Sequence, residues 1–158
     1  MATRQGRQGH PTFTTLMHHP DMNTSEQPTW DIVYTYTRAQ AIADGIQVEV
    51  TRTAAEAGIS IPVFLTRTVY EAYVTVPPGV NDGPCGTHQD EAGRLWDILW
   101  MLHHAIRRSR GGQAYLAFAL YVRNDNRAAR LVKLVAACGP VDIDDPAPCI
   151  TVMMPDED

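Results

Sequence analysis

The sequence predicts an α+β domain with short N-terminal helices and strands, one long central helix and a C-terminal antiparallel sheet. Three observations predict this class. Residues 46–51 alternate between apolar and polar side chains, which is typical of a half-buried strand. Residues 90–110 carry apolar side chains at helical spacing, and residues 113–154 hold three strand-like runs separated by turn residues.

The chain of 158 residues is long enough for one domain with its own apolar core, which we expect to span residues 29–158. Residues 1–28 are rich in Gly, Pro, Gln and Thr and show no helical or strand period. Burial of so few apolar side chains does not offset the entropy lost on ordering, so we expect a flexible N-terminal arm.

The N-terminal half of the domain is predicted to alternate between short elements. Residues 31–35 are expected to form a short strand, and Thr37 is expected to cap a helix over 38–44. The alternating strand 46–51 follows. Thr53 and Glu56 have the spacing of a capping box and predict a helical turn over 53–57.

The next segment, 59–65, is predicted to be extended, with Pro62 at an edge or entry position of a sheet. Thr66 is expected to begin a helix over 67–74, which ends before Pro77. Residues 77–88 contain repeated Gly and Pro and predict a loop.

Residues 90–110 predict the central helix of the core. Its apolar face is wide and comprises Ala92, Leu95, Trp96, Leu99, Leu102 and Ile106, with Ile98, Met101 and Ala105 beside them. Asp90, Arg94 and Asp97 share the remaining narrow face, where we expect exposed ion pairs worth roughly 0.2–0.5 kcal/mol each. Acids in the first turn and arginines in the last also suit the helix dipole.

The C-terminal part predicts an antiparallel meander packed on that helix. Its strands are expected at 113–123, 130–137 and 149–154, with a turn at 124–126. In the first of them one face carries Leu116, Phe118, Leu120 and Val122, and the other carries Tyr115, Ala117, Ala119 and Tyr121.

The net charge of −5 conceals a strong asymmetry along the chain. Residues 107–133 hold seven basic residues and one acid, for a net charge of +6, whereas residues 141–158 hold six acids and no base. The basic residues Arg107, Arg108, Arg110, Arg123, Arg127 and Arg130 are candidate phosphate-binding residues at one end of the sheet, with Tyr115 and Tyr121 available for stacking. A competing interpretation is that the acidic tail neutralises them within the fold.

Three cysteines in a domain of this size argue against a disulfide framework. Cys85 and His88 have zinc-ligand spacing and, with Cys138 and Cys149, form a weakly supported candidate for a zinc site. Buried apolar cysteines are the simpler interpretation, and we expect no metal or other cofactor.

His103 and His104 are adjacent on the helix and diverge by about 100°, so they do not chelate one metal together. With Asp90 and Glu91 they define a small-hydrolase alternative, which requires the fold to gather these groups in one pocket. The sequence contains none of the common signatures of acyl transfer, phosphate binding or metalloproteases, which favours a non-enzymatic function.

We expect no secretion signal, because no apolar stretch follows the basic residues near residue 1. Its apolar runs are far shorter than the roughly 20 residues that cross a bilayer, so we expect a cytoplasmic protein without membrane contact. The oligomeric state stays open.

Four stretches, YTYTRAQAIADG, IPVFLTRTVY, QDEAGRLWDILWM and CITVMMPDED, together resemble a family of small proteins with a domain of unknown function, encountered on bacterial plasmids, integrative elements and phages. The resemblance covers most of residues 30–158 and supplies no residue roles. It implies accessory functions for a mobile element, such as inhibition of host defence of the anti-restriction or anti-CRISPR type. With the charge asymmetry and the over-apolar helix face around Trp96 and Trp100, it favours binding to a protein partner, and nucleic-acid binding is the alternative.

Overall fold

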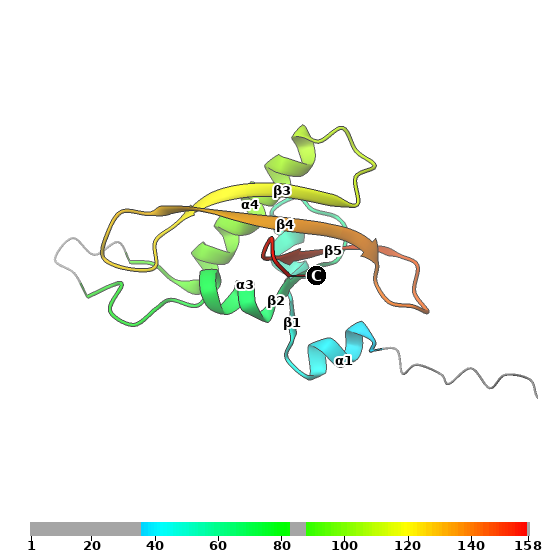
Figure 1. The fold of residues 1–158 in the computed structure, drawn as a ribbon, viewed down its shortest axis with the longest axis horizontal. Coiled ribbons are helices and arrows are strands. Elements are labelled where there is room, and N and C mark those ends of the chain that lie inside the picture. The colour runs from blue at the N-terminus through cyan, green and yellow to red at the C-terminus, as the bar shows by residue number, and fades with distance from the viewer. Residues whose placement is uncertain (1–35, 83–87, 158) are drawn as a thin grey trace, which may run out of the picture. The chain divides into compact units, whose positions relative to one another are not determined.

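The computed structural model describes residues 36–82 and 88–157. The predicted arm (1–28), the predicted strand (31–35) and Cys85 lie outside the described residues. The described chain forms a five-stranded sheet in the order β1-β2-β5-β4-β3 (Figure 1). The strands are β1 (Gln47–Glu49), β2 (Val63–Thr66), β3 (Tyr115–Val122), β4 (Arg130–Pro140) and β5 (Pro148–Met153).

The C-terminal strands form the predicted antiparallel meander. Tyr115 of β3 pairs with Ala137 of β4, and Ala136 of β4 pairs with Val152 of β5. The N-terminal pair β1–β2 is antiparallel, and β2 then joins β5 in parallel, with Val63 opposite Ile150. The α+β class is therefore confirmed, and the parallel pair makes the sheet mixed.

The short helices are α1 (Arg38–Ala43), α2 (Thr51–Glu56) and α3 (Arg67–Val69), which continues as the π-helical turn η1 (Tyr70–Val74). The Thr37 cap of α1 is confirmed: the Thr37 hydroxyl accepts from the Gln40 N–H at 3.2 Å, and Gln40 Oε1 accepts from the Thr37 N–H at 2.8 Å. The Thr66 cap of α3 is likewise confirmed by its bond from the Val69 N–H.

The predicted cap at Thr53 is wrong, because α2 begins at Thr51 and its N-cap is Val50. The predicted strand 46–51 is correspondingly shortened to β1. Tertiary bonds explain the shift: the Val50 N–H donates to Val63 O, and the Thr51 hydroxyl accepts from the Val63 N–H. This end of β2 therefore holds the first turn of α2 in place.

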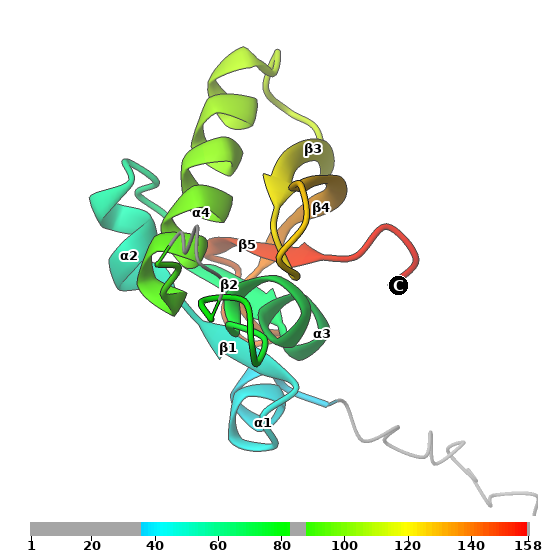
Figure 2. The same cartoon turned by 90° about the vertical axis from the view of Figure 1, so that its left-hand side faces the viewer.

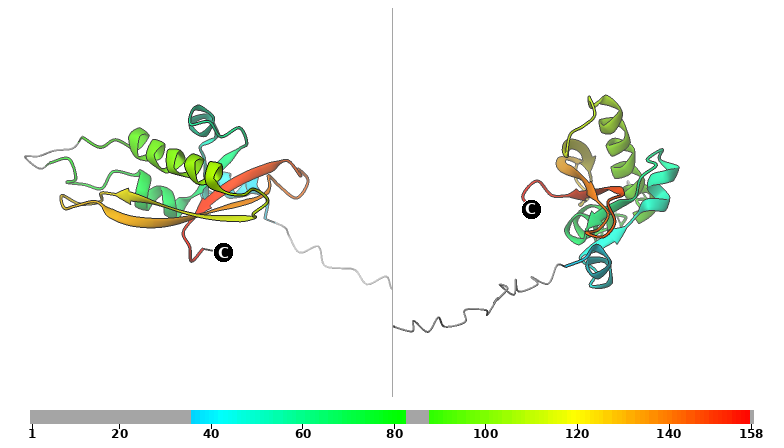
Figure 3. Two further views of the ribbon diagram at one scale, coloured as in Figure 1. Left: turned by 90° about the horizontal axis from the view of Figure 1, so that it is seen from above. Right: turned by 90° about the vertical axis from the view of Figure 1, so that its right-hand side faces the viewer.

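The long helix α4 (Glu91–Arg108) lies along one face of the sheet (Figures 2 and 3). Asp90 caps it, accepting from the Gly93 N–H at 2.6 Å. Ile98, Leu99 and Leu102 are fully buried in a core formed with the sheet residues Leu65, Phe118, Leu134 and Val152. The prediction that this segment is the central core helix is confirmed.

The predicted apolar face of α4 is too wide. Ala92, Trp96 and Met101, which the helical spacing places in the core, are exposed. The sheet covers one side of α4 and α2 lies beside it, and within the described residues no further layer covers its outer side (Figure 2). Arg94, predicted on the exposed face, is buried instead.

The sheet face opposite α4 is covered unevenly. Near α1 the Arg38 guanidinium lies 4.5 Å from the centre of the Phe64 ring and donates to Val141 O, Gln47 Oε1 and Thr151 Oγ1. On the β3–β4 part of this face, Tyr115, Tyr121 and Leu131 are exposed. The covered and bare halves of the face therefore lie on different strands.

The C-terminal turn is fastened to β2 by a carboxylate. Glu157 Oε2 accepts from the Thr66 hydroxyl at 2.9 Å and from the Met154 N–H at 2.7 Å. Burial raises the pKa of Glu157, but hydrogen bonds from Met154, Thr68 and Thr66 outweigh it and hold the pKa below its usual value. The ionised carboxylate is thus the form that the fold stabilises.

We expect this contact to make the protein acid-sensitive. A depressed folded pKa contributes stability above the unfolded value of about 4.3, and the contribution is lost as pH falls through the folded pKa. Urea unfolding at pH 7 and near pH 3 measures the loss, and Glu157→Gln is expected to reduce the difference between the two. Asp156→Asn is the control for the loss of one neighbouring charge. An equal pH dependence in Glu157→Gln and wild type would contradict the assignment.

Candidate functional site

The outer surface of α4 carries two exposed indole rings, a half-buried imidazole and an exposed guanidinium at helical spacing. Trp96, Trp100, His103 and Arg107 lie at i, i+4, i+7 and i+11, so they share one side of the helix, and we call them the aromatic stripe. The Trp96 and Trp100 rings stack with centroids 6.0 Å apart, and Trp100 stacks on His103 at 5.9 Å. Trp96 is 37% exposed and Trp100 is 44% exposed. The stripe is an ordered aromatic surface turned away from the core.

The stripe leads into a cavity of about 340 Å³ at the C-terminal end of α4. His103 and Arg107 form one wall, and Ile59, Ile61 and Ile106 contribute apolar surface. Gly58 allows the close approach of His103, because a Cβ at Gly58 would lie 3.0 Å from the imidazole Cε1, and its φ of +89° favours glycine. An apolar recess therefore adjoins two exposed tryptophans.

Sequence reasoning named Trp100 as a binding residue but placed Trp96 in the core, and it missed the cavity. The i, i+4, i+7, i+11 spacing of the stripe is a signal that the sequence contains. The cavity has no such signal, because only the fold brings its walls together: they come from residues 58–61, from residues 103–113, and from Leu116, Ala136, Cys138 and Ile150.

The groups of the predicted hydrolase site are not gathered in one place. Asp90 caps α4, and Glu91 accepts from the Tyr70 hydroxyl at 3.5 Å. His103 lies twelve residues further along the same helix, roughly 18 Å away at 1.5 Å per residue. His104 points away from the cavity, toward a groove beside β3. The geometry does not assemble an acid–base pair from these residues.

Arg94 is a buried residue that sequence reasoning misplaced, and it is only 6% exposed. Its Nε donates to Tyr73 O at 2.9 Å, and its Nη1 donates to Gln89 Oε1 at 2.9 Å and Arg123 O at 2.8 Å. Its Nη2 donates to Asn124 Oδ1. Burial lowers the pKa of Arg94, while the charge of Asp97 raises it. All three guanidinium nitrogens are engaged, so Arg94 joins α4, η1 and the β3–β4 hairpin rather than binding a ligand.

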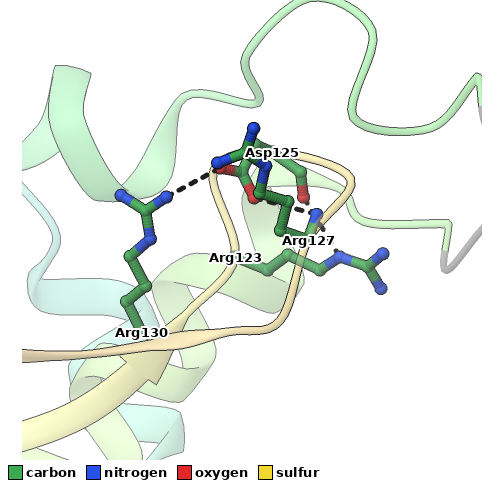
Figure 4. Close-up of polar contacts among 4 residues, drawn as sticks. All are labelled: Arg123, Asp125, Arg127 and Arg130. Carbon is green, nitrogen blue, oxygen red and sulfur yellow. Dashed lines mark hydrogen bonds and ion pairs between the residues drawn. The ribbon is translucent and has the colours of Figure 1, made fainter.

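The predicted phosphate-binding arginines of the β3–β4 hairpin each contact Asp125, through its carboxylate or its backbone carbonyl (Figure 4). Asp125 forms an ion pair with Arg130 at 3.1 Å and accepts from the Arg127 backbone N–H at 2.9 Å. Arg123 Nε donates to the Asp125 backbone carbonyl at 3.1 Å. Asp125 therefore offsets part of the positive charge at the hairpin.

The other predicted arginines, Arg107, Arg108 and Arg110, are exposed at the C-terminal end of α4. The prediction that both groups share one end of the sheet is wrong. The whole of β3 separates them, roughly 25 Å at 3.3 Å per residue. The chain passes from one end of the sheet to the other between the two groups, so they cannot form one patch.

The acidic tail does not form ion pairs with these arginines within the described residues. Asp142 accepts from the Arg38 and Ile143 backbone N–H groups, and Asp145 accepts from that of Ala147. The ion pairs of the described chain are Arg67–Glu71 and Arg130–Asp125, and neither involves the tail. Asp142 and Asp145 instead hold their own loop in place, and Asp142 also bonds it to the first residue of α1.

Two cysteines of the candidate zinc site, Cys138 and Cys149, lie on opposite faces of the sheet. Cys138 is exposed and Cys149 is buried. They lie one register step apart on β4 and β5, because Cys138 pairs with Ile150, so their side chains point to opposite faces. Burial raises the pKa of the Cys149 thiol, which donates to Pro140 O. No metal-binding group of three His, Cys, Asp or Glu exists among residues 36–82 and 88–157. Cys85 lies outside these ranges.

Comparison with known proteins identifies the family. Residues 22–158 match the model of a family of unknown function, DUF6573, and the chain belongs to that family. No curated protein and no solved structure matches the chain. In the described part of the chain, no helix has the length and apolar character needed to span a membrane.

Proposed function

We propose that this member of the DUF6573 family is a non-enzymatic accessory protein of a mobile genetic element that acts by binding a protein partner through the aromatic stripe. The observation that carries the proposal is the stacked pair Trp96–Trp100, which faces outward beside an apolar cavity of about 340 Å³. Tryptophan and arginine are enriched among the residues that dominate binding energy in protein interfaces.

The geometry of the stripe suits a rigid binding surface. Stacking between Trp96, Trp100 and His103 restricts the rings before a partner arrives, which reduces the entropy lost on binding. The cavity beside His103 has the size and lining to receive one apolar side chain of the partner. Arg107 at its wall adds a positive charge, so a partner with an apolar anchor next to a carboxylate fits this site best.

The mobile-element role rests on the family resemblance of the four sequence stretches and on the charge asymmetry. In that setting the partner is a host-defence protein of the restriction or CRISPR type, whose inhibition benefits the element. The separated basic and acidic segments would steer association with such a partner electrostatically.

The alternatives have less support. Binding to nucleic acid through residues 107–133 is disfavoured for two reasons. The two arginine groups lie at opposite ends of β3, and in the hairpin group the Asp125 carboxylate pairs with Arg130 and offsets part of the positive charge. The hydrolase alternative lacks a common pocket for His103, Asp90 and Glu91. Loss of a low-salt gel shift on replacing Arg127 and Arg130 would revive the first alternative.

Site-specific photo-crosslinking in a bacterial host tests the proposed function. A photoreactive phenylalanine derivative replaces Trp100, and the matched control carries it at Leu131, which is 55% exposed on the other face of the sheet. We expect position 100 to give one discrete adduct with a host polypeptide, and Trp96→Ala to weaken it. Absence of an adduct at 100, or the same adducts from 131, would contradict the proposal. An adduct between two copies of this chain would point to self-association instead.

A further inference from the structure

We infer that β3 is a dimerisation edge, along which two copies of this chain pair antiparallel about Phe118 to form one continuous sheet. This inference does not depend on the proposed function, because it uses a different part of the surface. It rests on the edge position of β3, the order of its residues, the direction of its free backbone groups and the charges of α4 beside it.

β3 is the last strand of the sheet in the described chain and lacks the features that usually block edge pairing. Edge strands are commonly protected by charged side chains, proline or bulges. β3 is eight residues long, with the sequence YLAFALYV, and contains none of these. Tyr115 and Tyr121 are each 69% exposed. Such an edge is a template for another strand.

The order of residues in β3 is self-complementary. Residues 115–121 read Tyr-Leu-Ala-Phe-Ala-Leu-Tyr, which is the same in both directions about Phe118. Antiparallel pairing centred on Phe118 therefore places Tyr115 opposite Tyr121 of the second copy, and Ala117 opposite its Ala119. Leucine likewise meets leucine on the α4 side of the sheet. An isologous twofold interface needs a surface that is complementary to itself, and β3 has one.

The backbone groups of β3 have the direction that this register requires. The Cys138 N–H donates to Ala114 O, so this opposed pair is a hydrogen-bonded pair of the β3–β4 ladder. Because such pairs alternate along antiparallel strands, residues 114, 116, 118, 120 and 122 bond to β4. The N–H and C=O groups of 115, 117, 119 and 121 then point to the open edge. Pairing about Phe118 places each odd-numbered residue opposite an odd-numbered residue of the second copy. The free N–H and C=O groups of the two opposed residues then form hydrogen bonds with each other.

The surface of α4 next to this edge is also self-complementary. Asp97, Met101, His104 and Arg108 form a second row at i, i+4, i+7 and i+11, and the last three line a groove with residues 116–119 of β3. A twofold axis through Phe118 brings the two helices onto the same side of the sheet and makes them antiparallel. The Asp97 end of one row then faces the Arg108 end of the other, and the two Met101 side chains lie near the axis. Opposite charges therefore meet, which favours a second copy as the occupant.

Paired charge substitutions on the bare sheet face test the register. In the proposed dimer, residue 117 lies opposite residue 119 of the second copy. Ala117→Glu with Ala119→Glu, the like-charge variant, places two carboxylates opposite each other, whereas Ala117→Lys with Ala119→Glu, the opposite-charge variant, places an ammonium opposite a carboxylate. The two double variants differ only in the charge at residue 117, and both carry Ala119→Glu opposite Lys133 of the same chain. Each is therefore the control for the other.

We expect the wild-type chain to sediment at twice its monomer mass of 17.5 kDa. The like-charge variant is expected to associate at least about tenfold more weakly, and the opposite-charge variant to remain dimeric. A wild-type chain that stays monomeric at all concentrations overturns the inference. Equal association of both variants overturns it too, since another surface would then hold the copies together.

Disulfide trapping supplies a test that does not require the charge variants to fold. In a chain whose native cysteines are replaced by serine, Tyr115→Cys is mixed with Tyr121→Cys under oxidising conditions. The opposed positions are expected to form a covalent dimer in the mixture, while each variant alone does not. Dimers of equal yield in the single-variant samples, or none in the mixture, contradict pairing about Phe118.

Discussion

Replacement of Arg94 by alanine is expected to lower the free energy of unfolding by about 3–5 kcal/mol, the largest loss for any charged residue of the described chain. The guanidinium donates to Tyr73 O, Arg123 O and two side-chain amide oxygens. Its removal leaves part-buried acceptors without their donor, and an acceptor left unsatisfied costs up to about 1–3 kcal/mol when it is buried, although such costs do not add in full.

Chemical denaturation of purified variants measures this effect. Arg94→Lys is expected to retain only part of the stability, because one ammonium group cannot reach acceptors on three segments as the planar guanidinium does. Arg107→Ala removes an exposed arginine from the same helix and is expected to change stability by less than about 0.5 kcal/mol. A loss below about 1 kcal/mol for Arg94→Ala would show that the three segments are held together by other contacts.

The second large effect is expected at Leu99, and its neighbour Trp100 supplies the contrast. Leu99→Ala should cost about 2–5 kcal/mol, because a fully buried leucine is replaced by a cavity. Trp100→Ala removes a larger side chain but is expected to cost less than about 1 kcal/mol, since the ring is 44% exposed and packs on Trp96, which is itself exposed.

Thermal and urea unfolding measure the loss of stability in each variant. A large loss for Leu99→Ala and a small one for Trp100→Ala would show that neighbouring residues of α4 belong to the core and to the surface, respectively. The result bears on function as well, since the proposed binding surface requires Trp100 to contribute little to folding. If Trp100→Ala proved as destabilising as Leu99→Ala, the aromatic stripe would be part of the core. The photo-crosslinking experiment would then lose its rationale.

Local sequence patterns predicted the parts of the fold that depend on near neighbours. The caps at Thr37 and Thr66 each bond a backbone N–H within three residues, so their side chains and spacing are sufficient to place them. The meander β3–β4–β5 follows from three strand-like runs joined by short loops. The long core helix follows from apolar side chains that recur at helical spacing along its whole length.

Features that depend on distant segments were predicted poorly. The spacing of Asp90, Arg94 and Asp97 suggested an exposed ion-pair row, whereas Arg94 is covered by segments 21 and 29 residues away in sequence. The basic residues of 107–133 are close together in sequence, yet an entire strand separates them in space. Composition reports how much charge a segment carries and does not report where the fold places it.

The sequence by itself therefore determined the long helix, most of the caps, the meander and the self-complementary order of residues 115–121. Only the tertiary structure decided that β2 pairs in parallel with β5, that Arg94 is buried, and that Trp96 and Trp100 remain exposed beside a cavity. The physical reason is the range of the interactions: backbone spacing specifies which side chains share a face, but the segments that cover each face arrive from far along the chain.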